Sequence, residues 1–227
     1  RAAASQHLGG SVKRVLLSQP GSSDVDATII WGLNQHVLTP SMTVVSAGSC
    51  TSNALMPILS IMDDALGINA GIVTTIHSAM NDQPVIDAYH HTDLRKTRAA
   101  FNSVIPVETG LAQGVERFLP HLGEKIQARA LRVPTLNVSS LDVVLAVDTA
   151  TSAADVNRII KEASQSFSGV LSVNEEPLAS CDFLGMDASC VVDITQTQVS
   201  GGQLIKLMLW FDNERAFTNR MVDIAIA

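Results

Sequence analysis

Charged residues and cysteines are both scarce in this chain of 227 residues. Asp, Glu, Lys and Arg make up 16% of it, against roughly 25% in a typical globular domain, while apolar residues make up 46%. This composition excludes a disordered chain and supplies the apolar surface for a substantial core. At about 100–200 residues per domain, the length allows one large domain or two small ones.

Basic residues are also in deficit relative to acidic ones. The chain has 15 Lys and Arg and 22 Asp and Glu, which gives a net charge of −7. The deficit argues against nonspecific binding to nucleic acid or anionic membranes, although a local basic site for a small phosphate remains compatible with it. No run approaches the roughly 20 apolar residues of a membrane-spanning helix. Neither a Gly-x-Gly-x-x-Gly turn nor a P-loop occurs, so no segment by itself indicates a nucleotide site.

Only three cysteines are present, Cys50, Cys181 and Cys190, which are too few and odd in number for a disulfide framework. We therefore expect a reducing, cytoplasmic compartment. Cys181 and Cys190 lack an activating setting and are predicted to be structural. His90 and His91 have no third ligand at metal spacing, so no metal site is predicted.

The hydrophobic pattern changes along the chain from alternating helices and strands to a strand-rich region. The fold class expected is therefore α/β followed by α+β. The helices are predicted over residues 1–9, 51–66, 152–166 and 213–227. The strands are predicted over residues 12–18, 28–32, 43–46, 72–77, 130–134, 141–147, 170–173, 190–195 and 204–211.

Cys50 is the leading candidate for a nucleophile, since it lies at the start of the best predicted helix. Free N–H groups and the positive end of the helix dipole stabilise a thiolate there and would lower the pKa of the thiol. The alternative is a small buried core residue, the commonest fate of a free cysteine. His77 ends a predicted strand 27 residues later, where it could return beside the thiol as its base. A polar surface histidine is the alternative.

Basic residues form a second candidate group, with Arg95, Lys96 and Arg98 close together and Arg132 within a predicted strand. Guanidinium groups at strand and loop ends suit phosphate recognition. From the residues alone, a solvated basic surface is the simpler interpretation.

Four motifs together resemble the phosphorylating glyceraldehyde-3-phosphate dehydrogenase family over nearly the whole chain. They are Ser49-Cys50-Thr51-Ser52-Asn53, Thr74-Thr75-Ile76-His77, Arg132-Val133-Pro134-Thr135 and Trp210-Phe211-Asp212-Asn213-Glu214. Residues 77–83, 85–90 and 195–201, with Phe217, look most like the erythrose-4-phosphate dehydrogenase branch. That branch implies oxidation of erythrose 4-phosphate to 4-phosphoerythronate in pyridoxine biosynthesis, by a cytoplasmic homotetramer.

The resemblance implies a role for each matching residue. Cys50 would attack the aldehyde, His77 would act as its base, and NAD would take the hydride, leaving a thioester for water or phosphate to release. Substrate binding would fall to Ser49, Thr51, Lys96, Thr109, Gly110 and Arg132. Cofactor binding would fall to Ser18, Asn213 and Phe217.

The chain departs from the family at Ala47-Gly48, where Asn-Ala is usual, and at Arg215-Ala216, where an aromatic residue and glycine are usual. The glycine-rich Rossmann half is absent, so residues 1–49 resemble only the end of an NAD-binding domain, followed by a catalytic domain over 50–212 and a returning helix over 213–227. We therefore expect a fragment that binds NAD weakly and exposes apolar surface. Two other functions stay open: oxidation of glyceraldehyde 3-phosphate, and a truncated non-catalytic chain that keeps the fold or a subunit interface.

Overall fold

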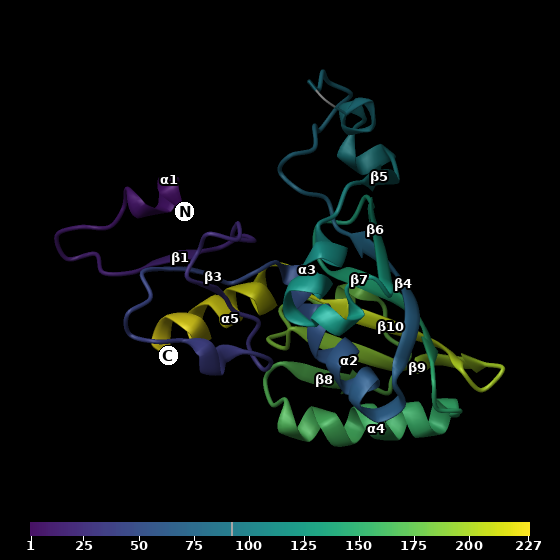
Figure 1. The fold of residues 1–227 in the computed structure, drawn as a ribbon. Coiled ribbons are helices and arrows are strands. Elements are labelled where there is room, and N and C mark those ends of the chain that lie inside the picture. Colours follow the sequence, from purple (N-terminus) through teal and green to yellow (C-terminus); the bar gives the residue numbers. More distant parts are fainter. Residues whose placement is uncertain (92) are drawn as a thin grey trace.

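A seven-stranded mixed sheet forms the centre of the fold (Figure 1) in a computed structural model that describes residues 1–91 and 93–227. Its strand order is β5-β6-β4-β7-β10-β9-β8, and neighbours are antiparallel except in the pairs β4–β6 and β8–β9. The strands are β4 Ile68–His77, β5 Ile105–Val107, β6 Ile126–Arg132, β7 Ser139–Val147, β8 Leu171–Asn174, β9 Cys190–Ser200 and β10 Leu204–Phe211. The expected, mostly antiparallel α+β region is confirmed.

A smaller sheet of three parallel strands lies beside the large one. Its order is β1 (Val15–Leu17), β3 (Val44–Ser46) and β2 (Ala27–Thr28). Helix α5 (Arg215–Ile226), the last of the chain, packs against this early segment through a cluster that includes Val45 and Ile224 (Figure 1). The first and last parts of the sequence are thereby brought together.

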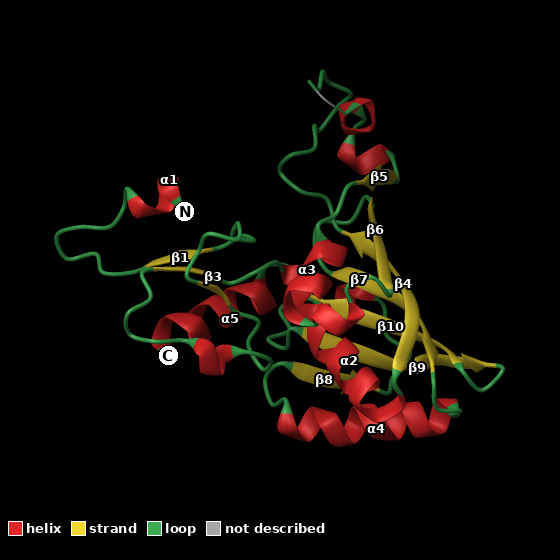
Figure 2. Cartoon of the chain, viewed as in Figure 1, coloured by secondary structure: helices red, strands yellow, loops and turns green. Residues whose placement is uncertain are grey.

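Three helices cover one face of the large sheet (Figure 2): α2 (Cys50–Leu66), α3 (Leu111–Phe118) and α4 (Ala153–Ser166). The short helical segments are α1 Ala2–Ser5 and the 3-10 turns Gln35–Val37, Leu94–Thr97, Ala100–Asn102, Pro120–Leu122 and Ser180–Phe183. In the part of the chain that the structure describes, no helix is both long and apolar enough to cross a bilayer.

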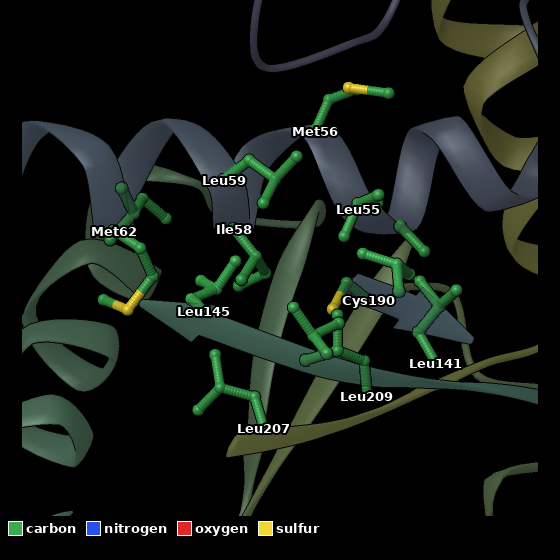
Figure 3. Packing of buried hydrophobic residues seen from close by; sticks show 14 of the residues in the cluster. Leu55, Met56, Ile58, Leu59, Met62, Leu141, Leu145, Cys190, Leu207 and Leu209 are labelled. Atoms are coloured by element: carbon green, nitrogen blue, oxygen red, sulfur yellow. The ribbon is translucent and has the colours of Figure 1, made fainter. Parts of the chain in front are cut away.

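Helix α2 is the centre of the hydrophobic core (Figure 3). Side chains three or four positions apart on α2 point onto the sheet and are fully buried there, each burial contributing about 1.5–3 kcal/mol. They are Leu55, Ile58 and Met62, which lie over Leu141, Leu145, Cys190, Leu207 and Leu209, while Leu59 is buried in the same cluster. The helix runs on through Pro57, which removes one backbone hydrogen bond, because burial on both sides of that residue holds it in place.

Several predicted elements differ in length from the observed ones. Strand 28–32 ends at Thr28, since the Asn34 side chain bonds the Thr28 carbonyl and the Ile30 N–H and so takes the groups that a sheet would use. The helix predicted over 1–9 is confined to Ala2–Ser5, and helix α3 was not predicted at all. Conversely, β9 continues to Ser200, because it pairs with β10 across the glycine turn.

Residues 79–91 and 93–104 form an arm that projects from the edge of the large sheet beyond β5 and β6 (Figure 1). Its apolar side chains are largely exposed, and ion pairs join its acidic and basic residues. The base of the arm follows His77 directly, so the arm borders the candidate site.

Candidate active site

Cys50 lies where strand β3 passes into helix α2. Gly48 makes the turn with a φ of 71°, and a Cβ at that position would approach Ile30 Cδ1 to 2.9 Å. Ser49 then caps the helix, its Oγ accepting the Ser52 N–H at 3.0 Å. The glycine that departs from the family pattern is thus required by the local backbone, and Cys50 becomes the first residue of α2.

His77 is the last residue of β4 and is only 5% exposed. Its Nε2 lies 3.6 Å from Cys50 Sγ, and its Nδ1 lies 2.9 Å from the Ser78 carbonyl oxygen. Because a carbonyl can only accept, Nδ1 carries the hydrogen, and the lone pair of Nε2 faces the thiol. The structure therefore brings together the two predicted catalytic side chains with the imidazole in the tautomer of a base.

Burial dominates the electrostatics of this pair. It raises the pKa of the Cys50 thiol, against the hydrogen bonds of Thr51 and the charge of Arg132. It also lowers the pKa of His77 to about 4; the Arg132 charge acts in the same direction and the Ser78 carbonyl opposes it. At neutral pH the pair consists of a thiol and a neutral imidazole. The expected lowering of the thiol pKa is therefore wrong, because removal from water outweighs the helix N-terminus.

A cavity of about 680 Å³, which we call the thiol cavity, opens beside Cys50 and His77. It is lined by all three residues predicted to bind the cofactor, Ser18, Asn213 and Phe217. Further lining comes from Ser49, Ala79, Met80, Asp82 and Met221. Groups from both ends of the chain and from the start of the arm therefore face the nucleophile.

Two buried hydroxyl groups orient the Asn213 carboxamide. Ser78 Oγ and Ser139 Oγ donate to Asn213 Oδ1 at 3.0 and 2.9 Å. The adjacent Asp212 accepts the backbone N–H groups that start helix α5. Asn213 Nδ2 is consequently left to donate into the cavity. Ser78 directly follows β4 and Ser139 begins β7, and nothing in their local sequence indicated this role.

A second cavity, also of about 680 Å³, shares Ser49 with the first, and we call it the hydroxyl cavity. Thr51, Thr109 and Gly110 line it, so four of the predicted substrate-binding residues converge there. Arg117, which was not predicted, also lines it and donates to the Gly21 carbonyl at 2.8 Å. Hydroxyl groups close to the start of helix α3, together with the cation of Arg117 in its last turn, are suited to an anion.

Arg132 lies at the end of β6, directly opposite His77 in the β4–β6 pairing. Its Nε is buried and has no hydrogen-bond partner among the described residues. It is absent from the lining of either cavity as the structure describes them. Its charge nevertheless acts on both Cys50 and His77.

Lys96 does not join the predicted anion-binding group. Its Nζ lies 3.5 Å from Asp82 Oδ2, and it lines a separate cavity of about 360 Å³ with Glu108. Arg98 is paired in the same way with Asp87, at 3.2 Å. The acidic residues of the arm thus attract these cations, and the assignment of Lys96 to the substrate site stays a prediction. Asp82 was missed, although it lies within residues 77–83.

The other cysteines differ from each other. Cys190 is fully buried in the sheet, which raises the pKa of its thiol, so a structural role is confirmed. Cys181 is exposed, so burial gives no support to its predicted structural role. Over residues 1–91 and 93–227, no three His, Cys, Asp or Glu side chains gather where they could hold a metal ion.

Comparison with protein families gives one decisive match. The family described as glyceraldehyde 3-phosphate dehydrogenase, C-terminal domain, matches residues 49–213. The chain belongs to this family. The matched span begins at Ser49, which caps helix α2, and ends at Asn213, which lines the thiol cavity. The glyceraldehyde 3-phosphate dehydrogenase family is one of oxidoreductases, and its members usually bind NAD.

Proposed function

We propose that this protein oxidises the phosphorylated aldose erythrose 4-phosphate to 4-phosphoerythronate, with NAD as the oxidant. The observation that carries the proposal is the 3.6 Å approach of Cys50 Sγ to His77 Nε2 at the start of α2. The choice of the erythrose branch rests on the sequence of residues 77–83 and 195–201, and on Phe217.

In the first step, Cys50 Sγ attacks the aldehyde carbon, and the carbonyl electron pair moves onto oxygen. His77 Nε2 takes the thiol proton as the sulfur–carbon bond forms, because both groups are neutral beforehand. The backbone N–H of Cys50, in the first turn of α2, faces the sulfur and can donate to the developing oxyanion. The product is a thiohemiacetal on Cys50.

The thiol cavity fits a nicotinamide ring. Asn213 Nδ2 is available for a carboxamide oxygen, while Phe217 and Met221 supply an apolar wall. NAD, when bound, would accept the hydride from the former aldehyde carbon. The hydroxyl proton of the thiohemiacetal would pass through His77 to solvent as the hydride leaves, so that a thioester remains on Cys50. His77, neutral again, would then remove a proton from the water that attacks the thioester, and the acid would leave as the Cys50 sulfur takes a proton back. The substrate phosphate would occupy the hydroxyl cavity, where Thr51 and Thr109 supply donors.

The test is NADH formation, read at 340 nm, with erythrose 4-phosphate in phosphate-free buffer. The sequence contains no glycine-rich dinucleotide turn, so NAD is supplied at millimolar concentration. We expect NADH to appear and to be abolished by Cys50→Ser, while the control Cys181→Ser, at an exposed cysteine, retains full activity. Absence of NADH, with Cys50 still open to alkylation, would support the non-catalytic alternative.

Glyceraldehyde 3-phosphate is the second candidate substrate, because the matched family carries its name. With this aldehyde, NADH formation should require added phosphate as the acyl acceptor. The ratio of kcat/KM for the two sugar phosphates separates the candidates.

We further propose that the protein acts as a cytoplasmic homotetramer. What supports an assembly is Ile72, an apolar side chain that is 59% exposed on the face of the large sheet opposite α2. Sedimentation velocity of the purified protein would give the number of subunits.

A further inference from the structure

The turn between strand β3 and helix α2 runs through the interior, where its backbone polar groups need partners. Strand β3 ends at Ser46, and the Ala47 N–H still donates to the Leu17 carbonyl at 3.0 Å. Strand pairing stops there. Two side chains, Ser46 and Asn53, then supply partners for the turn that follows, and both are buried.

Ser46 uses every hydrogen-bonding position of its hydroxyl group. Its Oγ accepts the Gly48 N–H at 3.1 Å and the Gly21 N–H at 3.0 Å, and it donates to the Gln19 carbonyl at 2.7 Å. Because a serine hydroxyl has one hydrogen and two lone pairs, these three bonds leave it a single orientation. They also tie the turn to residues 19–21, which form part of the walls of both cavities.

Asn53 bonds the same turn from within the first turn of α2. Its Nδ2 donates to the Ala47 carbonyl at 2.9 Å and to the Ser49 carbonyl at 2.8 Å. Both hydrogens of the amide group are used, so the orientation of this carboxamide is fixed as well. The backbone on either side of Gly48 is therefore held by side chains that lie outside the turn.

These bonds bear on the departure of this chain from the family at Ala47-Gly48. Neither residue has a polar side chain with which to hold the turn. Gly48 adopts a φ of 71°, and glycine loses more conformational freedom on ordering than any other residue. The geometry of the turn therefore depends on hydrogen bonds from other positions, which Ser46 and Asn53 provide.

This geometry matters because the turn places the nucleophile. Cys50 Sγ lies 3.6 Å from His77 Nε2, and a misplacement of about 1 Å can slow a reaction about 100-fold. We propose that Ser46 and Asn53 are positioning residues, which hold the turn so that the thiol of Cys50 stays within reach of its base. Neither side chain lines either cavity as the structure describes them, so both act through the backbone. The inference rests on the proposed function for its catalytic meaning, but its test needs neither NAD nor turnover.

The experiment is a double-mutant cycle on the alkylation of Cys50 by iodoacetamide, read by mass spectrometry at each cysteine. His77→Asn defines the part of the rate at pH 7 that depends on the imidazole. Ser46→Ala removes the hydroxyl group, and Asn53→Leu keeps about the size of the side chain and removes both donated bonds. Each should lower the rate at pH 7 about three- to tenfold. At about pH 9.5 the thiolate reacts without a base, so the rate there should change less than about twofold.

The cycle separates positioning from a purely structural role. In the His77→Asn background, Ser46→Ala should change the rate at pH 7 less than about twofold, because both substitutions act on the same pair. The matched control is Ser189→Ala. Ser189 is also buried and bonds Arg220, and it is outside the lining of both cavities, so its rates should stay within about twofold of wild type. Cys190, fully buried, should stay unlabelled in each folded variant.

An unchanged rate at pH 7 in a folded Ser46→Ala or Asn53→Leu variant would overturn the proposal. So would an equal loss in the His77→Asn background or in Ser189→Ala, or a wild-type rate that does not depend on His77. If either variant fails to fold, as labelling of Cys190 would show, the other one carries the test. If wild type forms no NADH but the cycle gives the expected coupling, the proposed oxidation is wrong and the positioning role is supported.

Discussion

Replacement of His77 tests the electrostatic account of the site through protein stability. The pKa of His77 is about 4 in the folded chain, against a reference value of 6.5. Between these values the unfolded chain binds the proton and the folded chain does not, so the free energy of unfolding increases with pH. The contribution is complete above about pH 6.5 and is lost as the pH falls towards 4. A difference of about 2.5 pH units corresponds to about 3 kcal/mol.

The assay is urea unfolding of wild type and His77→Asn at pH 7, 5 and 4. Asparagine keeps a donor for the Ser78 carbonyl and cannot titrate. On going from pH 7 to 5, wild type should lose about 2 kcal/mol more than the variant, and the loss should reach about 3 kcal/mol at pH 4. Both proteins contain the same carboxylates, so subtracting the change in unfolding free energy of the variant from that of wild type cancels the contribution of those carboxylates.

The control is His36→Asn, since His36 is exposed on the surface. Its stability should follow the wild-type dependence on pH. If His77→Asn also followed it, burial would not hold this imidazole neutral, and the picture of a neutral thiol–imidazole pair would fail.

Three shorter predictions follow from other parts of the fold. Alkylation of Cys50 by iodoacetamide should increase with pH with a midpoint above the ordinary thiol pKa; a midpoint below about 8.5 would contradict the effect of burial. Leu59→Ala should lower the free energy of unfolding by about 2–5 kcal/mol in urea, because the side chain is fully buried in the core cluster around α2; a loss below about 1 kcal/mol would contradict that packing. Ser152→Ala should cost about 1 kcal/mol, since Ser152 Oγ accepts the Asp155 N–H that starts α4, and Ser152→Asn should restore most of it.

Helices and strands were predicted correctly where a long segment has a regular spacing of apolar residues. Helix α2 was expected over 51–66 and found over Cys50–Leu66, and β10 was found as expected over 204–211. Apolar spacing along these segments decides which face is buried, and that preference acts locally. The prediction of a strand over 28–32 was wrong for a reason that the apolar pattern does not contain. The side chain of Asn34 bonds the backbone N–H and C=O groups that the strand would have used for pairing.

The site could be predicted in part. Neighbouring residues in the sequence predicted that Cys50 starts a helix and that His77 ends the next strand. Both predictions were possible because the start of a helix and the end of a strand have local sequence signals. The ion-pair partner of Lys96 could not be predicted from the sequence. Asp82 lies 14 residues away, and only the fold of the arm brings the two side chains together. The pair of serines that holds Asn213 likewise comes from distant segments.

By itself, the sequence determined which residues are the candidate nucleophile, the candidate base and the helix cap, and which family they resemble, because residue type and local spacing carry that information. Tertiary structure alone decided the charge states. Whether Cys50 rests as thiol or thiolate depends on how much water the packed sheet and helices remove, set against hydrogen bonds and the Arg132 charge. Burial is a property of the whole fold, and it reversed the pKa expected from the helix start.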